Sequence, residues 1–104
     1  MSFDELIHAP TRLQICALLA AVDSAEFATV RDAVGVSDSV LSKHVRSLHE
    51  AGYVAVRKAP VGPRVRTWLS LTKSGRRAFD GHVAALRQML GDDAVGAPTA
   101  AAAR

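Results

Sequence analysis

The sequence predicts a mainly α-helical fold with one small β hairpin, and three patterns support this prediction. Apolar residues recur at helical spacing through residues 38–50, just after a glycine and a serine that suit a tight turn between helices. Residues 53–71 alternate apolar and polar side chains around a segment with two prolines and a glycine, which is typical of a hairpin. Residues 73–90 return to helical spacing. At 104 residues, the chain is long enough for one domain with one modest core.

The turn between the two central helices is predicted from Gly35 and Ser37. A first helix over residues 28–34 can end at Gly35, because glycine adopts a positive φ without steric cost. Ser37 is placed to cap the second helix, and Asp38 in its first turn complements the helix dipole. We therefore expect a second helix over residues 38–50.

The second helix has two different faces. Leu41, Val45 and Leu48 recur at i, i+4 and i+7, so they are expected to pack into the core. The opposite face carries small hydroxyl groups and positive charges, on Ser39, Ser42, Lys43 and Arg46. A face without acidic side chains can approach phosphate groups, which makes it a candidate surface for nucleic acid.

The hairpin is expected to have strands at residues 53–58 and 65–71, joined by a loop at residues 59–63. Four positive side chains lie near its tip, on Arg57, Lys58, Arg64 and Arg66. Such a hairpin can follow a DNA backbone or place an arginine in the minor groove. The alternative is that these charges keep the strand edges from pairing with other chains.

Two shorter helices are predicted before the central pair. Ser2 and Glu5 have the spacing of a capping box, so a short helix is expected over residues 3–8. Pro10 suits the first turn of a second helix, which is expected to run over residues 10–22 in the core. Residues 23–26 are expected to form a polar connection.

The last helix is predicted over residues 73–90, with Thr72 as its cap. A narrow apolar seam runs along it, and we interpret this seam as a dimer contact in which Met89 fills gaps. The alternative is that the helix folds back on its own domain. The seam consists of Phe79, Val83, Leu86, Met89 and Leu90. Residues 91–104 have no periodicity and are expected to form a flexible tail.

The net charge of +3 conceals an uneven distribution of charge along the chain. Residues 1–42 carry two basic and six acidic groups, whereas residues 43–77 carry nine basic groups and one acidic group. The basic segment contains both the second central helix and the hairpin. This is the charge pattern expected of a protein with a polyanionic partner, although helices and hairpins also present lysine and arginine to water.

Motifs for other kinds of chemistry are missing from the sequence. The single cysteine, Cys16, allows no disulfide within the chain, and its apolar neighbours favour a buried, unreactive thiol. No two histidines have metal-ligand spacing, and no glycine-rich phosphate loop or catalytic triad is recognisable. His44 and His49 lie on the flank of the second central helix, where they can contact phosphate or pack against the fold. We therefore expect no enzyme, no metal and no cofactor. Without a signal segment or a membrane span, we expect a cytoplasmic protein.

The segment GVSDSVLSKHVRSLHEAGYV resembles the recognition segment of winged helix-turn-helix transcription regulators, particularly the MarR and ArsR-like groups. The following RTWLSLTKSG is similar to the second wing strand of those proteins and the helix start that comes after it. The resemblance covers roughly residues 10–90. It implies a winged helix-turn-helix fold, with a three-helix core, a wing and a C-terminal dimerisation helix.

Together, the charge pattern and the resemblance predict a dimeric transcription regulator that binds double-stranded DNA sequence-specifically. Whether a small-molecule effector exists stays open. The alternatives are a protein-interaction module without DNA readout and, more weakly, an RNA-binding module. The predicted DNA-binding residues are Ser37, Asp38, Ser39, Ser42, Lys43, Arg46, Arg57, Lys58, Arg64 and Arg66.

Overall fold

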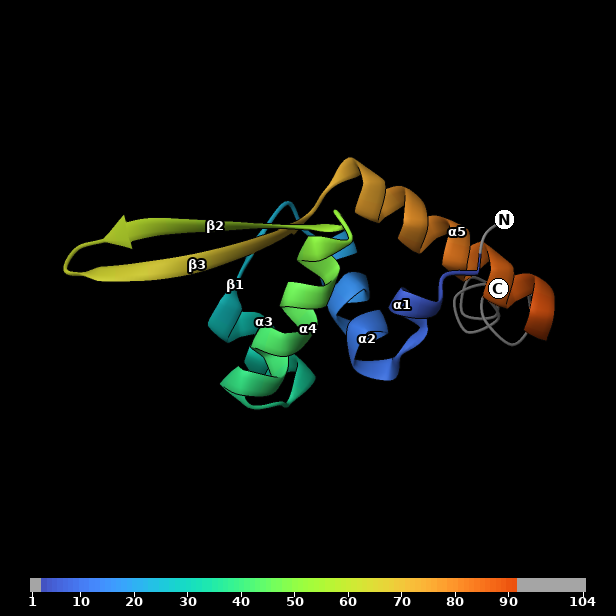
Figure 1. Cartoon of the computed structure of the whole chain (residues 1–104), viewed down its shortest axis with the longest axis horizontal. Coiled ribbons are helices and arrows are strands. Elements are labelled where there is room, and N and C mark those ends of the chain that lie inside the picture. Colours follow the sequence, from blue (N-terminus) through green and yellow to red (C-terminus); the bar gives the residue numbers. More distant parts are fainter. Residues whose placement is uncertain (1–2, 92–104) are drawn as a thin grey trace, which may run out of the picture.

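The computed structural model describes residues 3–91, which form a helical core with a three-stranded sheet. Helices α2, α3 and α4 pack together, the hairpin β2–β3 extends from one side, and α5 runs along the other (Figure 1). The predicted mainly α fold with a wing is confirmed. In chain order the elements are α1 (Glu5–His8), α2 (Pro10–Ala20), β1 (Ala25–Glu26), α3 (Phe27–Val34), α4 (Asp38–Glu50), β2 (Val54–Val61), β3 (Arg64–Leu71) and α5 (Lys73–Leu90).

The turn between α3 and α4 forms as predicted. Gly35 ends α3 with a φ of 78°, and its N–H donates to the carbonyl of Arg31. The Ser37 hydroxyl accepts from the amide of Val40 at 3.2 Å, so Ser37 caps α4. The predicted bounds of α4 are confirmed, and α3 begins at Phe27, one residue before the predicted start.

The core is aliphatic and is shared by helices and sheet. Leu41 and Leu48 of α4 are fully buried, together with Ile15 and Leu19 of α2 and Leu69 of β3. The apolar face of α4 therefore anchors this helix against both α2 and the sheet. As a result the opposite, polar face of α4 is turned away from the core.

The sheet contains a strand that the sequence pattern did not predict. Ala25–Glu26, which we expected in a polar connection, forms β1 and pairs antiparallel with β3 opposite Leu69 and Trp68. The strand order is β1-β3-β2, so β3 is central and β2 lies at the edge. The prediction was wrong because two residues are too few to show an alternating pattern.

The hairpin is longer than predicted. The expected loop at residues 59–63 is wrong, because β2 continues to Val61 and only Gly62 and Pro63 separate it from β3. Pro60 pairs in register with Val65 inside the ladder. A proline is tolerated here because β2 is an edge strand. Its other side has no neighbouring strand in the sheet, so the missing N–H breaks no pairing there. Gly62 turns the chain with a φ of 61°.

The N-terminal helices begin or end at other residues than predicted. Asp4 caps α1, with Oδ1 accepting from the Ile7 amide at 3.0 Å, so the predicted start at residue 3 is wrong; Ser2 lies outside the described residues. Helix α2 begins at Pro10 as expected but ends at Ala20. The guanidinium of Arg76 on α5 donates to the carbonyls of Ala20 and Val22, so these carbonyls at the end of α2 have hydrogen-bond partners.

Helix α5 packs against its own domain through the first part of its length. Thr72 caps it as predicted, with its hydroxyl accepting from the Gly75 amide at 2.9 Å. His82 and Ala85 are buried, and Phe79 packs against the core. Phe79, which we expected in a dimer seam, is therefore engaged within the chain, as the alternative interpretation required.

The C-terminal end of α5 extends beyond this packing. Met89 and Leu90 are 66% and 60% exposed. The predicted flexible tail begins at Gly91, and residues 92–104 lie outside the described residues. None of the helices formed by residues 3–91 combines the length and the apolar character needed to cross a bilayer.

Candidate nucleic-acid interface

The outward face of α4 presents every polar side chain that the sequence predicted there. These residues are exposed because Leu41, Val45 and Leu48 fix the opposite face of the helix in the core. The exposed set is Ser39, Ser42, Lys43 and Arg46. The helix thus offers two hydroxyl groups, an ammonium group and a guanidinium group to a partner.

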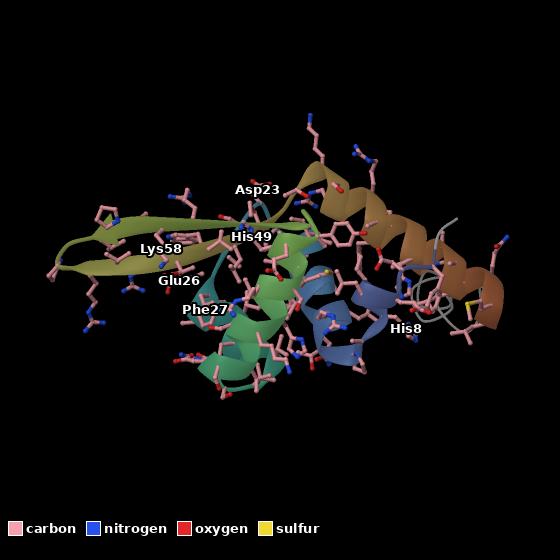
Figure 2. All side chains as sticks on the ribbon, viewed as in Figure 1. His8, Asp23, Glu26, Phe27, His49 and Lys58 are labelled. Carbon is pink, nitrogen blue, oxygen red and sulfur yellow. The ribbon has the colours of Figure 1, made fainter. Side chains whose placement is uncertain are left out.

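A groove between α4 and the wing brings three of the predicted residues together. Ser42 and Arg46 line it from α4, and Lys58 lines it from β2. Its volume is about 430 Å³. Phe27, His49 and Lys58 line it from three different elements (Figure 2), and the remaining lining residues are Val45 of α4 with Val56, Thr67 and Leu69 of the sheet. The groove therefore has an apolar floor with positive charge on both sides.

The basic residues of the wing do not all face this groove. Lys58 does, but its neighbour Arg57 lies on the opposite face of the sheet, where its guanidinium carbon is 5.9 Å from the centroid of the Trp68 ring. Arg57 and Trp68 are cross-strand partners, so their contact follows from the register. Successive residues of a strand alternate between faces, which separates Lys58 from Arg57.

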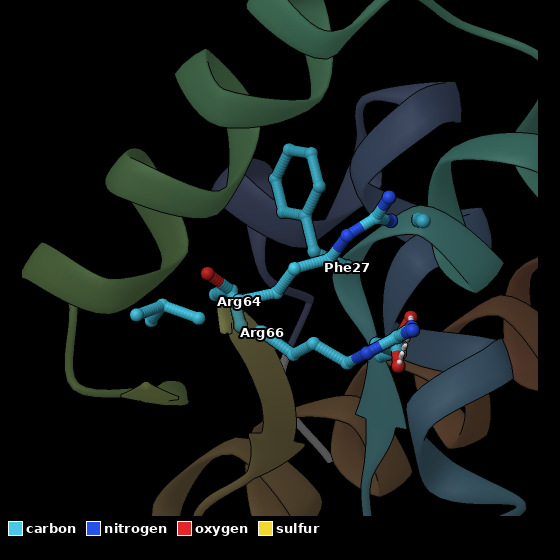
Figure 3. A pocket seen from close by; sticks show the side chains of 7 residues that line it. Phe27, Arg64 and Arg66 are labelled. Carbon is cyan, nitrogen blue, oxygen red and sulfur yellow. Dashed lines mark hydrogen bonds and ion pairs between the residues drawn. The ribbon is translucent and has the colours of Figure 1, made fainter. Parts of the chain in front are cut away.

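Arg66 is held by an acidic partner. Its guanidinium donates to both carboxylate oxygens of Glu26, each at 2.9 Å, in a half-buried ion pair (Figure 3). Arg64, Arg66 and Phe27 line a pocket where β3 passes the start of α3. Arg64 is exposed. Arg64 and Arg66 were both predicted to bind DNA, but the positive charge of Arg66 is already paired with Glu26.

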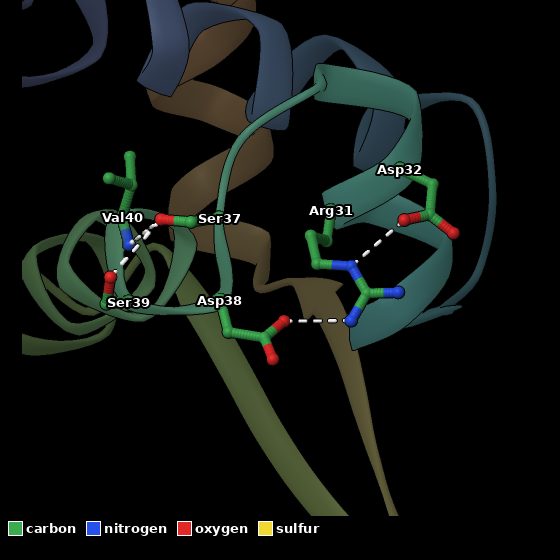
Figure 4. A network of polar contacts seen from close by, with 6 residues as sticks. All are labelled: Arg31, Asp32, Ser37, Asp38, Ser39 and Val40. Carbon is green, nitrogen blue, oxygen red and sulfur yellow. Dashed lines mark hydrogen bonds and ion pairs between the residues drawn. The ribbon is translucent and has the colours of Figure 1, made fainter.

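An ion-pair network surrounds the N-terminal end of α4 (Figure 4). Arg31 of α3 donates to Asp38 at 2.8 Å and to Asp32 at 2.9 Å, and these bonds raise the pKa of its guanidinium further above the usual range. Nearby, the Ser37 and Ser39 hydroxyls lie 3.2 Å apart. Exposed pairs of this kind add little stability, but Arg31 offsets the negative charge of Asp38 beside a surface that would meet phosphate.

Two histidines on the flank of α4 make contacts within the protein. The Nδ1 atom of His44 lies 3.2 Å from the guanidinium of Arg12, and burial, followed by Arg12 and Lys43, lowers the pKa of His44. His49 Nδ1 donates to the carbonyl of Val54 at 3.0 Å. These contacts favour the packing interpretation of both side chains and help to fix α4 against α2 and β2.

The described residues contain no group of three or more side chains suited to hold a metal ion. Cys16 is buried, and that burial, with a smaller effect of Asp4, raises the pKa of its thiol to about 11. A thiol with so high a pKa stays protonated near neutral pH and is a poor nucleophile.

Comparisons with known proteins agree with this geometry. A family model described as a winged helix DNA-binding domain matches residues 11–90. The chain is similar to the uncharacterized protein MJ0432 of Methanocaldococcus jannaschii, with 28% identity over 85 residues, which cover 82% of this chain and 92% of that protein.

Two solved structures show the same fold. A transcriptional regulator homologue from Pyrococcus horikoshii OT3 superposes with a TM-score of 0.78 at 23% identity, covering 84% of this chain and 86% of that one. ZitR, a zinc-responsive MarR family member of Lactococcus lactis, has a TM-score of 0.58 at 26% identity, covering 80% of this chain and 60% of that one. The predicted resemblance to winged helix regulators of the MarR kind is confirmed. The chain belongs to the family of winged helix DNA-binding domains, with the fold of winged helix transcription regulators.

Proposed function

We propose that this protein binds duplex DNA sequence-specifically as a homodimer and so regulates transcription. The observation that supports this proposal most strongly is the groove in which Ser42 and Arg46 of α4 meet Lys58 of the wing. An α-helix of this kind fits the major groove, and a neighbouring cation can contact the phosphates at its edge.

Each side chain of α4 has a role in this proposal. Arg46 is the last of the four exposed polar residues along α4 and lines the groove beside the wing, where it donates to a guanine edge, the commonest specific contact of an arginine. Lys43 binds a guanine or a phosphate, and Ser39 and Ser42 donate shorter hydrogen bonds. Near the start of the helix, Ser37 and Asp38 lie close to the DNA and help to set its position.

The wing contributes contacts to the backbone. Lys58 reaches phosphate from the groove side, and Arg64 reaches phosphate or the minor groove from the exposed end of β3. Arg57, on the opposite face, adds to the positive field of the wing rather than to the groove. Arg66 adds to DNA binding only in so far as Glu26 releases it.

A homodimer is supported by the apolar end of α5. Met89 and Leu90 are exposed, and Val83 and Leu86 are partly exposed on the same helix, whereas Phe79 meets the core. A two-fold axis through these ends would place two α4 helices on one side of a duplex. Their half-sites would then lie about one helical turn, roughly 34 Å, apart, so the target should be a near-palindrome.

The proposal is tested by selecting bound fragments from a random duplex library with the full-length chain. The expected result is an enriched near-palindrome whose binding weakens steeply with salt. Enrichment of an unrelated set of sequences, with affinity equal for all duplexes, would refute sequence-specific readout. No binding even at low salt would favour the protein-interaction module instead.

A further inference from the structure

A hydrogen-bonded pair of histidines, whose rings are nearly perpendicular, joins the N-terminal segment to α5. His82 on α5 is fully buried, and its Nε2 lies 3.2 Å from Nδ1 of His8 on α1. The backbone N–H of Asp4 donates to His82 Nδ1 at 3.0 Å. The ring of Phe3 packs against both imidazoles, with ring centroids 4.7 Å apart in each case. Helix α1 lies alongside α5 at this point (Figure 1), and His8 is at the end of α1 (Figure 2).

These hydrogen bonds permit only one arrangement of protons. A backbone N–H can only donate, so Nδ1 of His82 must be the unprotonated nitrogen of its ring. A neutral His82 then carries its proton on Nε2 and donates it to Nδ1 of His8. A proton added to either ring would place two donors face to face. If His82 took up the proton, its Nδ1–H would face the N–H of Asp4. If His8 took up the proton, its Nδ1–H would face the Nε2–H of His82.

The pair is connected to the turn after α4 through Asp4. One carboxylate oxygen of Asp4 caps α1, and the other accepts from the hydroxyl of Tyr53 at 2.6 Å. Tyr53 lies in the turn after α4, directly before β2, and its carbonyl accepts from the amide of Thr72 just before α5. Residues 3–8 therefore touch α5 and the junction between α4 and the wing.

The ionisable groups around His82 are known from each element that surrounds it. His8 on α1 and Asp4 before it act on His82 directly, whereas Tyr53, in the turn after α4, and Cys16 on α2 are coupled to Asp4. Burial, followed by His8, lowers the pKa of His82, while Asp4 acts in the opposite sense. Since the unfolded chain takes up this proton at higher pH than the folded chain, the contribution of His82 to stability is fully present above about pH 6.5 and is lost as the pH falls below it.

We propose that His8 and His82 form an acid-opened latch, which ties residues 3–8 to α5 near neutral pH and releases them when either ring takes up a proton. The latch is a property of the fold itself and does not depend on the proposed DNA binding. Opening the latch should therefore release α1 from α5 and break the hydrogen bond between Asp4 and Tyr53 at the same time.

The latch is tested by NMR on the full chain between pH 7.5 and 5, above the range near 4 where carboxylates usually titrate. The amide signal of Asp4 is expected to move with pH together with the ring signals of His82, and the amides of α1 should lose protection from hydrogen exchange over the same range. An Asp4 amide that stays constant over this range in the wild-type protein would overturn the proposal.

Three variants make the test specific. His8→Asn places an amide oxygen where Nδ1 was, so it accepts from His82 but cannot take up a proton, and the midpoint at Asp4 should move to lower pH. His82→Gln places its amide nitrogen where Nε2 was and leaves no atom at the position of Nδ1 to accept from the Asp4 amide, so α1 should be unprotected at every pH. His44→Asn, at a second histidine with a lowered pKa, should leave the Asp4 midpoint unchanged. Equal midpoints in the wild type and His8→Asn, or a shifted midpoint in His44→Asn, would contradict the latch.

Discussion

Arg46 and Lys58 show how the site depends on individual side chains. They belong to different elements, and the packing of α4 against the sheet brings both to one groove. Two like charges close together in a folded protein carry a cost unless a partner of opposite sign compensates for it. This arrangement favours a polyanion that spans the helix and the wing.

The first prediction concerns Arg46. Arg46→Ala should weaken binding to the selected palindrome by about 1–3 kcal/mol, because it removes a base contact, and should weaken binding to random DNA much less. The measurement is a fluorescence-anisotropy titration of both duplexes at several salt concentrations. Arg77→Ala, which removes an exposed arginine of α5 outside the groove, is the matched control. An equal loss in both variants would contradict the assignment.

The second prediction concerns Glu26, which no sequence pattern marked as part of the site. Glu26→Gln should release Arg66 from its ion pair, so affinity for any duplex should rise about threefold at low salt and the salt slope should steepen by up to about one. Glu5→Gln removes the same charge from exposed α1 and serves as the control. Identical gains in the two variants would mean that net charge alone explains the effect and that Arg66 plays no part.

At the residue scale, the sequence predicted which side chains of α4 are exposed but not which basic groups of the wing work together. Arg57 and Lys58 were grouped because they are neighbours in sequence, yet strand alternation places them on opposite faces. That separation could have been predicted from the strand itself. The pairing of Arg66 with Glu26 could not, because it joins residues 40 positions apart.

At the scale of elements, predictions succeeded where the physical cause is local. The bounds of α4 and the cap of α5 depend on residues within one turn, so Ser37 and Thr72 marked them correctly. The predicted hairpin was too short because Pro60 was expected to end the strand. A proline does so only in a strand that has neighbouring strands on both sides. That condition depends on the strand order, which the local sequence does not contain.

The third prediction tests the close packing of α5 on the turn that follows α4. A Cβ at Gly75 would lie 2.1 Å from the carbonyl oxygen of Tyr53, so the backbones cannot stay in place. Alanine is favoured over glycine in a helix by about 1 kcal/mol, yet this clash should outweigh that gain. Gly75→Ala should therefore lower the free energy of unfolding by about 2 kcal/mol or more.

Urea unfolding followed by circular dichroism measures this change. Ser74→Ala, at the exposed position just before, should alter the free energy of unfolding by less than about 0.5 kcal/mol. If Gly75→Ala proved as stable as the wild type, the contact between α5 and Tyr53 would be looser than the geometry requires. Loss of soluble protein in that variant alone would agree with the prediction.

At the scale of the whole molecule, α5 has two different parts. The part up to Ala85 completes the core, with Phe79 and His82, while the last turn leaves Met89 and Leu90 in solvent. The seam predicted from spacing thus combines a contact within the chain and an uncovered apolar end. Sequence spacing alone could not separate them, because the face that α5 turns to its own domain is set by packing against α1, α2 and β3, and both helices lie more than 50 residues away in the chain.

The fourth prediction follows from this division. Replacing Met89 and Leu90 together by Glu should convert a dimer to a monomer without lowering the melting temperature, because both side chains are mostly exposed within the chain. A monomer binds only one half-site at a time, so its affinity for the palindrome should fall by about 100-fold or more, whereas its affinity for a single half-site should stay the same. Sedimentation equilibrium and titrations of both duplexes measure these quantities. Gln88→Glu is the control in the same turn, and a double variant that remains dimeric would show that the two-fold contact lies elsewhere on the chain.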